Sequence, residues 1–317
     1  MIGMHAVLVR RAITAAAILF ALSSEAHSQQ QRADPDFKPV ADKPAYTKHH
    51  PQILFDEAHH NFHTASGRYK PFADLITSDG CVITPNTEKF TAKSLKGFDV
   101  LIIANAMGAE RMGTEEAQNP AFTVKESRAV RDWVKAGGAL LLITDHYPMG
   151  SAAERLAKQF GIDSSTGATE EYTFEKGAGL GDHAILKGRN DSERVKKVGT
   201  FTGQSLKGPP GSEQFLKLPD DATERVPDPE NPFRNKPLTR SAKGRCQAVA
   251  LKFGKGRVVM LGEAAMLSAQ LAPDGSKFGM NVEGTDNKQF ALNVIHWLTG
   301  LLDAGESQDQ PGTGAGN

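Results

Sequence analysis

The stretch ALLLITDHYP at residues 139–148 decides the fold class, because an apolar run passes directly into a polar turn. Ala139 to Thr144 is apolar on both faces, as a central strand of a parallel sheet is when helices cover both of its sides. Asp145, His146, Tyr147 and Pro148 follow at once. We therefore predict a buried strand whose carboxyl end carries polar side chains.

Other short apolar runs on both sides of this stretch also end in polar residues. They alternate with segments of helical spacing, and one of these begins with the capping-box pair Thr123 and Glu126. Strands that alternate with helices indicate βαβ units, so we predict an α/β fold with a mostly parallel sheet and right-handed crossovers. The predicted strands are 52–55, 81–84, 99–104 and 139–144, followed by a hairpin of 246–253 and 257–261; the predicted helices are 68–78, 122–136, 151–160 and 287–298.

The two ends of the chain differ in composition from its middle. Residues 1–28 have a basic start, an apolar stretch from Ala12 to Leu22 and small residues before the expected cut, as a secretory signal does. The alternative is a membrane anchor, but the apolar stretch is shorter than the roughly 20 residues that span a bilayer. We therefore predict a periplasmic or secreted protein with no transmembrane segment after signal removal. The predicted organisation is a flexible arm at 29–50, one domain at 51–300 with a loop-rich insertion at about 163–245, and a disordered tail at 301–317.

Charge and cysteine content narrow the classes of function. The chain has 37 Lys and Arg and 37 Asp and Glu, a formal net charge of zero, so nothing attracts nucleic acid or an anionic membrane. Its two cysteines, Cys81 and Cys246, would pair in an oxidising compartment if their Cα atoms lie within about 7 Å, and are otherwise two buried thiols. Their spacing fits no cysteine-based zinc site.

Several segments resemble a family of uncharacterised exported proteins with a class I glutamine-amidotransferase-like domain. They are AGGALLL at 136–142, DHAILKG at 182–188, GRVV at 256–259 with Gly262 and Glu263, and the closing segment from Asn287 to Leu298. The resemblance covers about residues 51–300 and implies a doubly wound, flavodoxin-like sheet. It implies little about activity, because such folds carry catalytic and non-catalytic domains alike. A working amidotransferase has a cysteine on the turn after a central strand, and the matching turn, residues 144–147, has none.

Polar residues follow four of the predicted strands. The carboxyl ends of parallel strands form one rim, where ligands bind near the point at which the strand order reverses, so we expect these residues to form a site. Carboxylates and imidazoles from separate strands could hold a divalent metal or act as a general acid and base. We assign Asp145, His146 and Glu263 to catalysis, Glu57, His60 and Asn105 to ligand binding, and Asp56, His59 and His146 to a divalent metal.

Several of these residues, and His63 in the same loop as His59 and His60, also have a purely structural interpretation. Asp56 and Asp145 could cap helices or hold loops, and His59, His60 and His63 could be solvated loop histidines. Outside the rim, His183 could shape a turn in the insertion, and His296 could pack beside Trp297 on the last helix.

Two classes of function remain open. The first is a non-catalytic domain that binds a small-molecule or envelope ligand, such as a sugar or a peptide, and the absence of a nucleophile favours it. The second is a hydrolase that uses the rim, with a metal or with an acid and base pair, to activate water for attack on an ester, amide or glycosidic bond.

Overall fold

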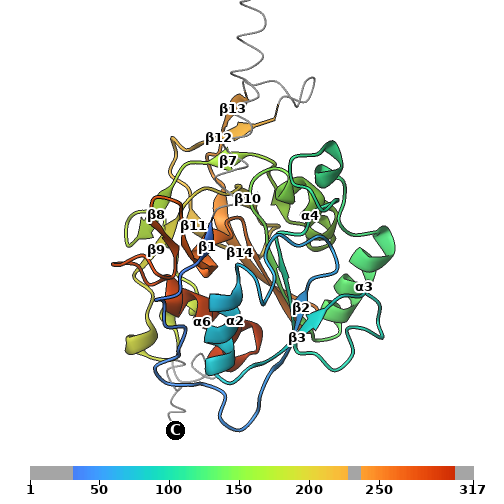
Figure 1. The fold of residues 1–317 in the computed structure, drawn as a ribbon, viewed down its shortest axis with the longest axis vertical. Coiled ribbons are helices and arrows are strands. Elements are labelled where there is room, and N and C mark those ends of the chain that lie inside the picture. Colours follow the sequence, from blue (N-terminus) through green and yellow to red (C-terminus); the bar gives the residue numbers. More distant parts are fainter. Residues whose placement is uncertain (1–30, 228–236, 304–317) are drawn as a thin grey trace, which may run out of the picture.

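The computed structural model describes residues 31–227 and 237–303. Their main feature is a sheet of nine strands that runs through the middle of the molecule (Figure 1). In this sheet β3, β2, β4, β5 and β15 are neighbours in that order and run parallel. The prediction of an α/β fold with a mostly parallel central sheet is confirmed. These strands are β2 (Gln52–Asp56), β3 (Val82–Asn86), β4 (Val100–Ala104), β5 (Ala139–Ile143) and β15 (Gly256–Leu261).

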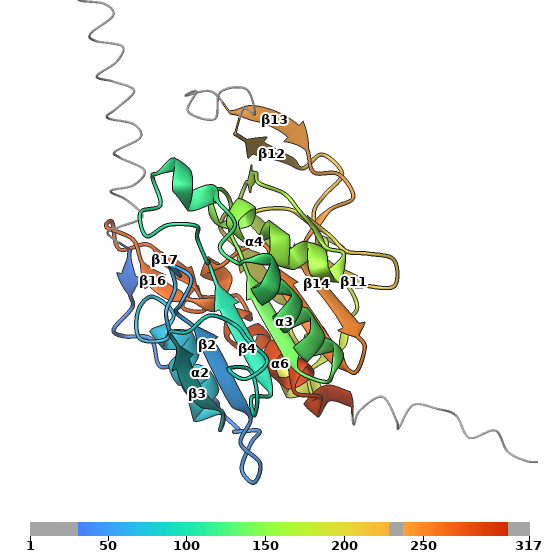
Figure 2. The same ribbon diagram turned by 90° about the vertical axis from the view of Figure 1, so that its right-hand side faces the viewer.

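Helices cover both faces of the parallel strands (Figure 2). Alternate residues of each strand point to opposite faces, so Ile102 and Leu141 pack in one apolar cluster while Leu101 and Leu140 pack in the other. Helices α2 and α6 contribute to the first cluster, and α3 and α4 contribute to the second. Their bounds are α2 (Lys70–Ser78), α3 (Val124–Lys135), α4 (Met149–Ala157) and α6 (Asn287–Leu298).

The capping box predicted for α3 is present. Thr123 Oγ1 accepts a hydrogen bond from Glu126 N at 3.2 Å, and Thr123 N donates to Glu126 Oε2 at 3.0 Å. These two bonds satisfy backbone donors that the first turn of a helix leaves without partners. The residue pair therefore fixes where this helix begins.

The other half of the sheet is antiparallel and includes part of the predicted insertion. β14 (Cys246–Phe253) forms the predicted hairpin with β15, and β10, β11 and β6 extend the sheet beyond it. Part of the insertion forms short strands, because buried Leu206 and Phe215 lie on strands that pair with β14. These strands are β6 (Asp163–Ser164), β10 (Leu206–Lys207) and β11 (Glu213–Lys217).

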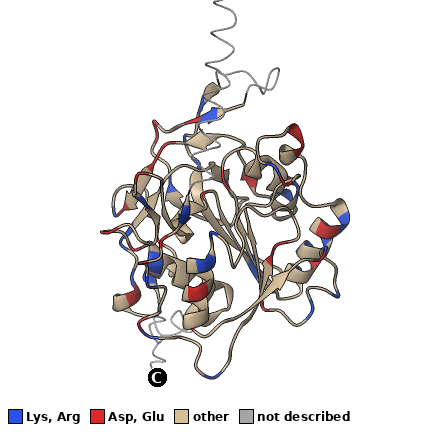
Figure 3. Cartoon of the chain, in the orientation of Figure 1, with Lys and Arg blue, Asp and Glu red and all other residues tan. Residues whose placement is uncertain are grey.

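The remaining elements are short and surround this sheet. Charged residues of both signs are interspersed over the surrounding helices and loops (Figure 3). The strands are β1 (Arg32–Ala33), β7 (Ala168–Thr169), β8 (Tyr172–Glu175), β9 (Lys197–Thr200), β12 (Thr223–Val226), β13 (Leu238–Ser241), β16 (Ala269–Leu271) and β17 (Lys277–Gly279); the helical turns are η1 (Glu115–Gln118), η2 (Lys158–Phe160), α5 (Ala184–Lys187), η3 (Asp191–Glu193) and η4 (Ala265–Leu267).

Residues 31–50 differ from the flexible arm that their polar composition suggested. β1 pairs with β16, and Ala41 and Tyr46 are buried against the core. Asp79 ties the segment down, because its Oδ1 accepts from Ala45 N at 2.8 Å and its carbonyl accepts from Tyr46 N at 3.0 Å. A few apolar side chains and one capping carboxylate therefore hold the segment in place despite its many polar residues.

The two cysteines are unpaired and buried. Cys81 belongs to the apolar cluster on one face of the sheet and Cys246 to the cluster on the other face. Burial raises the pKa of each thiol to about 12. Of the two alternatives, the structure has buried thiols and no disulfide between them.

Some predictions concern residues that the structure does not describe. The signal at 1–28 lies outside the described residues, as does the predicted tail except for residues 301–303. Within residues 31–227 and 237–303, no helix is long and apolar enough to cross a membrane.

Candidate functional site

The ends of the parallel strands bring the predicted polar residues to one edge of the sheet. Backbone pairing continues just past the strands, because Asn105 N donates to Ile143 O and Thr144 N donates to Leu261 O, each at 2.9 Å. Asn105, Asp145 and Glu263 therefore come from adjacent strands and share this edge. We call it the carboxyl edge.

Asp145 and His146 are the partly exposed members of this group. Their side chains are 13% and 40% exposed. Asp145 Oδ1 accepts from His146 N at 2.7 Å, and Oδ2 lies 3.4 Å from Ala264 N, so the carboxylate joins the loops after β5 and β15. His146 Nδ1 lies 2.8 Å from the Tyr147 carbonyl oxygen. A carbonyl can only accept, so Nδ1 carries the proton and Nε2 of the neutral ring keeps a lone pair.

Glu263 is fully buried beside Asp145. Its Oε1 accepts from Ala265 N at 2.8 Å and its Oε2 accepts from Met266 N at 2.7 Å, so the carboxyl group shapes the turn after β15. Burial, and then the negative charge of Asp145, raise the pKa of Glu263 well above its ordinary value. Glu263 can therefore hold a proton, but its side chain is not accessible to a ligand.

Two buried aromatic side chains that are not among the predicted site residues complete this part of the edge. Tyr69 is fully buried, and its hydroxyl donates to Ala264 O at 2.5 Å. Burial, followed by the charges of Glu263 and Asp145, raises its pKa well above the ordinary value. The His63 ring meets Tyr69 edge-on at 4.5 Å, and burial lowers the pKa of His63 to about 3. Tyr69 immediately precedes the amphipathic helix α2. Its spacing from the apolar residues of that helix predicted a core residue and gave no sign of a place in the site.

Asp56 and His59 form a separate, enclosed group with Glu126 of α3. His59 Nδ1 lies 2.9 Å from both carboxylate oxygens of Asp56, and its Nε2 lies 3.0 Å from Glu126 Oε1. Although burial alone would lower the pKa of His59, hydrogen bonds and charges of Asp56 and then Glu126 raise it. The rings of Phe90 and Phe122 each lie 4.7 Å from the imidazole. We call Asp56, His59 and Glu126 the closed cluster.

The three residues assigned to ligand binding have different surroundings. Glu57 is partly buried, and its Oε1 accepts from Ala65 N at 2.9 Å, which holds the loop after β2. Asn105 is buried, and its Oδ1 has no hydrogen-bond partner among the described residues. His60 is exposed. His60 and Asn105 both have φ of 49°, a conformation that non-glycine residues seldom adopt.

The residues assigned to a metal do not come together as a set of ligands. Both ring nitrogens of His59 already face carboxylates, so neither offers a lone pair to a cation. His146 lies with Asp145 instead. Within the described part of the chain, no group of three His, Cys, Asp or Glu side chains is arranged to hold a metal ion. The metal assignment to Asp56, His59 and His146 therefore does not fit this geometry.

Comparison with known proteins identifies similar folds and no family. No family model matches the sequence, and no curated protein is similar to it. The structure is similar to the N-terminal domain of mmIFT52, with a TM-score of 0.55 and 15% identity over 78% of this chain and 97% of that domain. This likeness shows a shared fold and nothing about activity.

Two other solved structures are similar at a lower level. A ThuA-like protein from Bacteroides uniformis has a TM-score of 0.42 and 14% identity, over 80% of this chain and 94% of its own. A GMP synthase-like protein from Thermoplasma acidophilum has a TM-score of 0.40 and 12% identity, over 82% of this chain and 100% of its own.

Proposed function

We propose that the chain is an exported ligand-binding domain with a glutamine-amidotransferase-like, flavodoxin-like fold, and that its ligand binds at the carboxyl edge. The order of the parallel strands, β3-β2-β4-β5-β15, supports this description, because it matches the 2-1-3-4-5 order of doubly wound sheets of this kind. The basic start and apolar stretch of residues 1–28 support export to the periplasm or beyond.

One observation carries the binding proposal: the contrast in exposure among the polar residues of this edge. Asp56, Asn105 and Glu263 are buried, whereas Asp145 and His146 are partly exposed. Asp145 offers carboxylate oxygens and His146 offers the Nε2 lone pair, so both can accept hydrogen bonds. The ligand that fits carries donors, such as the hydroxyl groups of a sugar or the amino groups of a peptide or envelope fragment.

A screen of sugars, short peptides and cell-envelope fragments by heteronuclear NMR would test this function. We expect a ligand to shift the amide signals of residues 145–147, and His146→Ala to weaken its binding. Lys255→Ala is a matched control, because Lys255 is exposed on the turn between β14 and β15, at the opposite end of these strands. Ligands whose affinity is the same in wild type and His146→Ala would contradict the proposal.

The second candidate is a hydrolase that works by acid and base catalysis, and the raised pKa of Glu263 beside Asp145 favours it. In such an enzyme the Nε2 lone pair of His146 would accept a proton from water. Hydrolysis of chromogenic esters, amides or glycosides that is lost in Asp145→Asn would establish this activity. Absence of turnover together with ligand binding would leave the binding domain as the function.

A further inference from the structure

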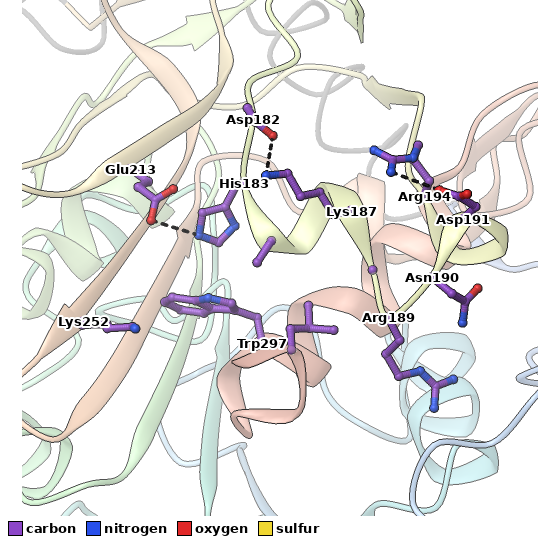
Figure 4. Close-up of a pocket in the computed structure, with 13 residues that line it drawn as sticks. Asp182, His183, Lys187, Arg189, Asn190, Asp191, Arg194, Glu213, Lys252 and Trp297 are labelled. Atoms are coloured by element: carbon purple, nitrogen blue, oxygen red, sulfur yellow. Dashed lines mark hydrogen bonds and ion pairs between the residues drawn. The ribbon is translucent and has the colours of Figure 1, made fainter. Parts of the chain in front are cut away.

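A polar hollow lies at the end of the sheet opposite to the carboxyl edge. It is a pocket of about 470 Å³ between α5, η3, the last turn of α6 and the end of β14 (Figure 4). Lys252 lines it and pairs with Arg257 near the start of β15, whereas Glu263 follows the other end of β15. This pocket is therefore separate from Asp145 and His146.

His183 supplies a buried hydrogen-bond donor in the wall of this pocket. Its Nδ1 accepts from Ile185 N at 3.1 Å, so the proton of the neutral ring is on Nε2. The side chain is only 2% exposed, and Nε2 has no hydrogen-bond partner among the described residues. Glu213 Oε1 is the near acceptor in Figure 4, but at 3.7 Å it is beyond hydrogen-bonding distance.

The His183 ring is held rigidly in this orientation. It stacks on Phe215 with the ring centroids 5.0 Å apart and the planes 4° from parallel, and it also contacts the Trp297 ring at 5.1 Å. Burial, and then the charge of Lys187, lower the pKa of His183 to about 4. The ring is therefore neutral at neutral pH, and its Nε2–H is a preorganised donor without an acceptor, which is an uncommon state for a buried polar group.

Charged residues of both signs line the pocket: the basic residues are Lys187, Arg189, Arg194 and Lys252, and the acidic residues are Asp182, Asp191 and Glu213. Arg189 pairs with Glu193 beside the pocket. Lys187 pairs with Asp182 at 3.0 Å, and Arg194 pairs with Asp191 at 3.1 Å, so these pairs largely cancel. Lys252 is exposed and makes no ion pair with any residue in the described part of the chain. An adjoining hollow of about 730 Å³ shares Asp182, Lys187 and Arg194, and Lys176 and Lys196 add positive charge there.

We propose that this pocket binds a small organic anion, whose carboxylate or phosphate oxygens accept from His183 Nε2 and face Lys252. Trp297 and Leu302 line the same pocket and offer an apolar wall to the body of the ligand. An oxyanion suits both partners, because it accepts hydrogen bonds and balances the cation. The site is independent of the carboxyl edge, and neither proposal requires the other.

Isothermal titration calorimetry on the full chain would test the site with three probes: benzoate, phenyl phosphate and inorganic phosphate. We expect benzoate or phenyl phosphate to bind, and the preferred one identifies the anionic group. His183→Asn is the sharpest variant, because Asn also caps helix N-termini and can keep the bond from Ile185 N while it removes the Nε2 donor. We expect it to weaken binding about tenfold or more.

Lys252→Gln tests the charge without touching the core, and we expect it to weaken binding about twofold to fivefold, with less effect in high salt. Lys255→Gln is the matched control, since this lysine is exposed three residues away and does not line the pocket. If His183→Asn fails to fold, Lys252→Gln decides alone. The proposal is overturned if no probe binds at about 10 mM, or if affinity is the same in the variants and the control.

Discussion

Two groups at the carboxyl edge each contain one histidine and two carboxylic acids, yet they differ in what surrounds them. In the closed cluster both nitrogens of His59 are bonded to carboxylates and two phenylalanine rings flank the imidazole. In the other group, Asp145, His146 and Glu263, the imidazole is 40% exposed and its Nδ1 is bonded to a neighbouring carbonyl. We call this second group the open cluster.

The comparison shows that residue type alone does not distinguish structure from function. A histidine whose two nitrogens are both engaged can stabilise the fold but has nothing left to offer a ligand. A histidine anchored by Nδ1 alone presents its Nε2 in a defined orientation. The closed cluster therefore holds the loop after β2 against α3, whereas Asp145 and His146 of the open cluster are partly exposed and can be reached by a ligand.

The largest effect that we predict comes from breaking the closed cluster. His59→Ala leaves the carboxylates of Asp56 and Glu126 buried without their cationic partner, and should lower the free energy of unfolding by about 3–5 kcal/mol. Urea denaturation monitored by circular dichroism would measure it. Lys70→Ala, which breaks the exposed Lys70–Asp74 pair, is the control and should change stability by at most about 1 kcal/mol. Similar losses in the two variants would contradict our description of the closed cluster.

A somewhat smaller loss should follow from removing the buried member of the open cluster. Glu263→Ala leaves Ala265 N and Met266 N without their acceptor, and should cost about 2–4 kcal/mol of stability. The same denaturation experiment measures this loss. Glu263→Gln keeps one acceptor oxygen and the side-chain volume, so it should be less harmful than alanine. Equal losses would show that the hydrogen bonds of this side chain are not what stabilises the turn.

The stabilisation by the two clusters should also begin to decline at different pH values as pH rises. Folding raises the pKa of His59 above 6.5, so its stabilisation is complete below pH 6.5 and is lost as pH rises through the folded-state pKa. Folding raises the pKa of Glu263 above 4.5, so its contribution is complete below pH 4.5 and declines as pH rises from there. The free energy of unfolding should be measured against pH. We expect the pH dependence due to His59 to disappear in His59→Gln, and the one due to Glu263 to disappear in Glu263→Gln. If both variants flatten the same pH range, the clusters do not titrate separately.

The sequence predicted the layout of this edge better than it predicted the contacts within it. The apolar runs 52–55, 99–104, 139–144 and 257–261 identified the strands, because burial on both faces leaves a clear pattern. That pattern was enough to place Asp56, Asn105, Asp145 and Glu263 at strand ends. It could not show which of them are buried, because exposure depends on loops and helices from elsewhere in the chain.

The partners of His59 show why contacts between distant parts of the chain could not be predicted from the sequence. Glu126 lies 67 positions away in the sequence. Its place in the capping box already explained why a glutamate stands there, so nothing in the sequence indicated that it contacts His59. The sequence likewise indicates only that Tyr69 packs beside a helix. Its hydroxyl in fact donates a hydrogen bond to the carbonyl oxygen of Ala264, 195 positions later. The packing of residues 31–50 was missed for the same reason, since Asp79 supplies contacts that no local pattern reveals.

The smallest effect on stability should come from the exposed histidine of the open cluster. His146→Ala removes a side chain whose bonds lie within its own turn, so the free energy of unfolding should change by no more than about 0.5 kcal/mol. Nitrogen-15 shifts of the imidazole in the wild type should show the proton of the neutral ring on Nδ1. A stability loss near that of His59→Ala would make the open cluster structural as well, and the carboxyl edge would lose its accessible partner for a ligand. If His146→Ala loses little stability but binds its ligand more weakly, His146 serves ligand binding, whereas His59 serves stability, as their different hydrogen bonds predict.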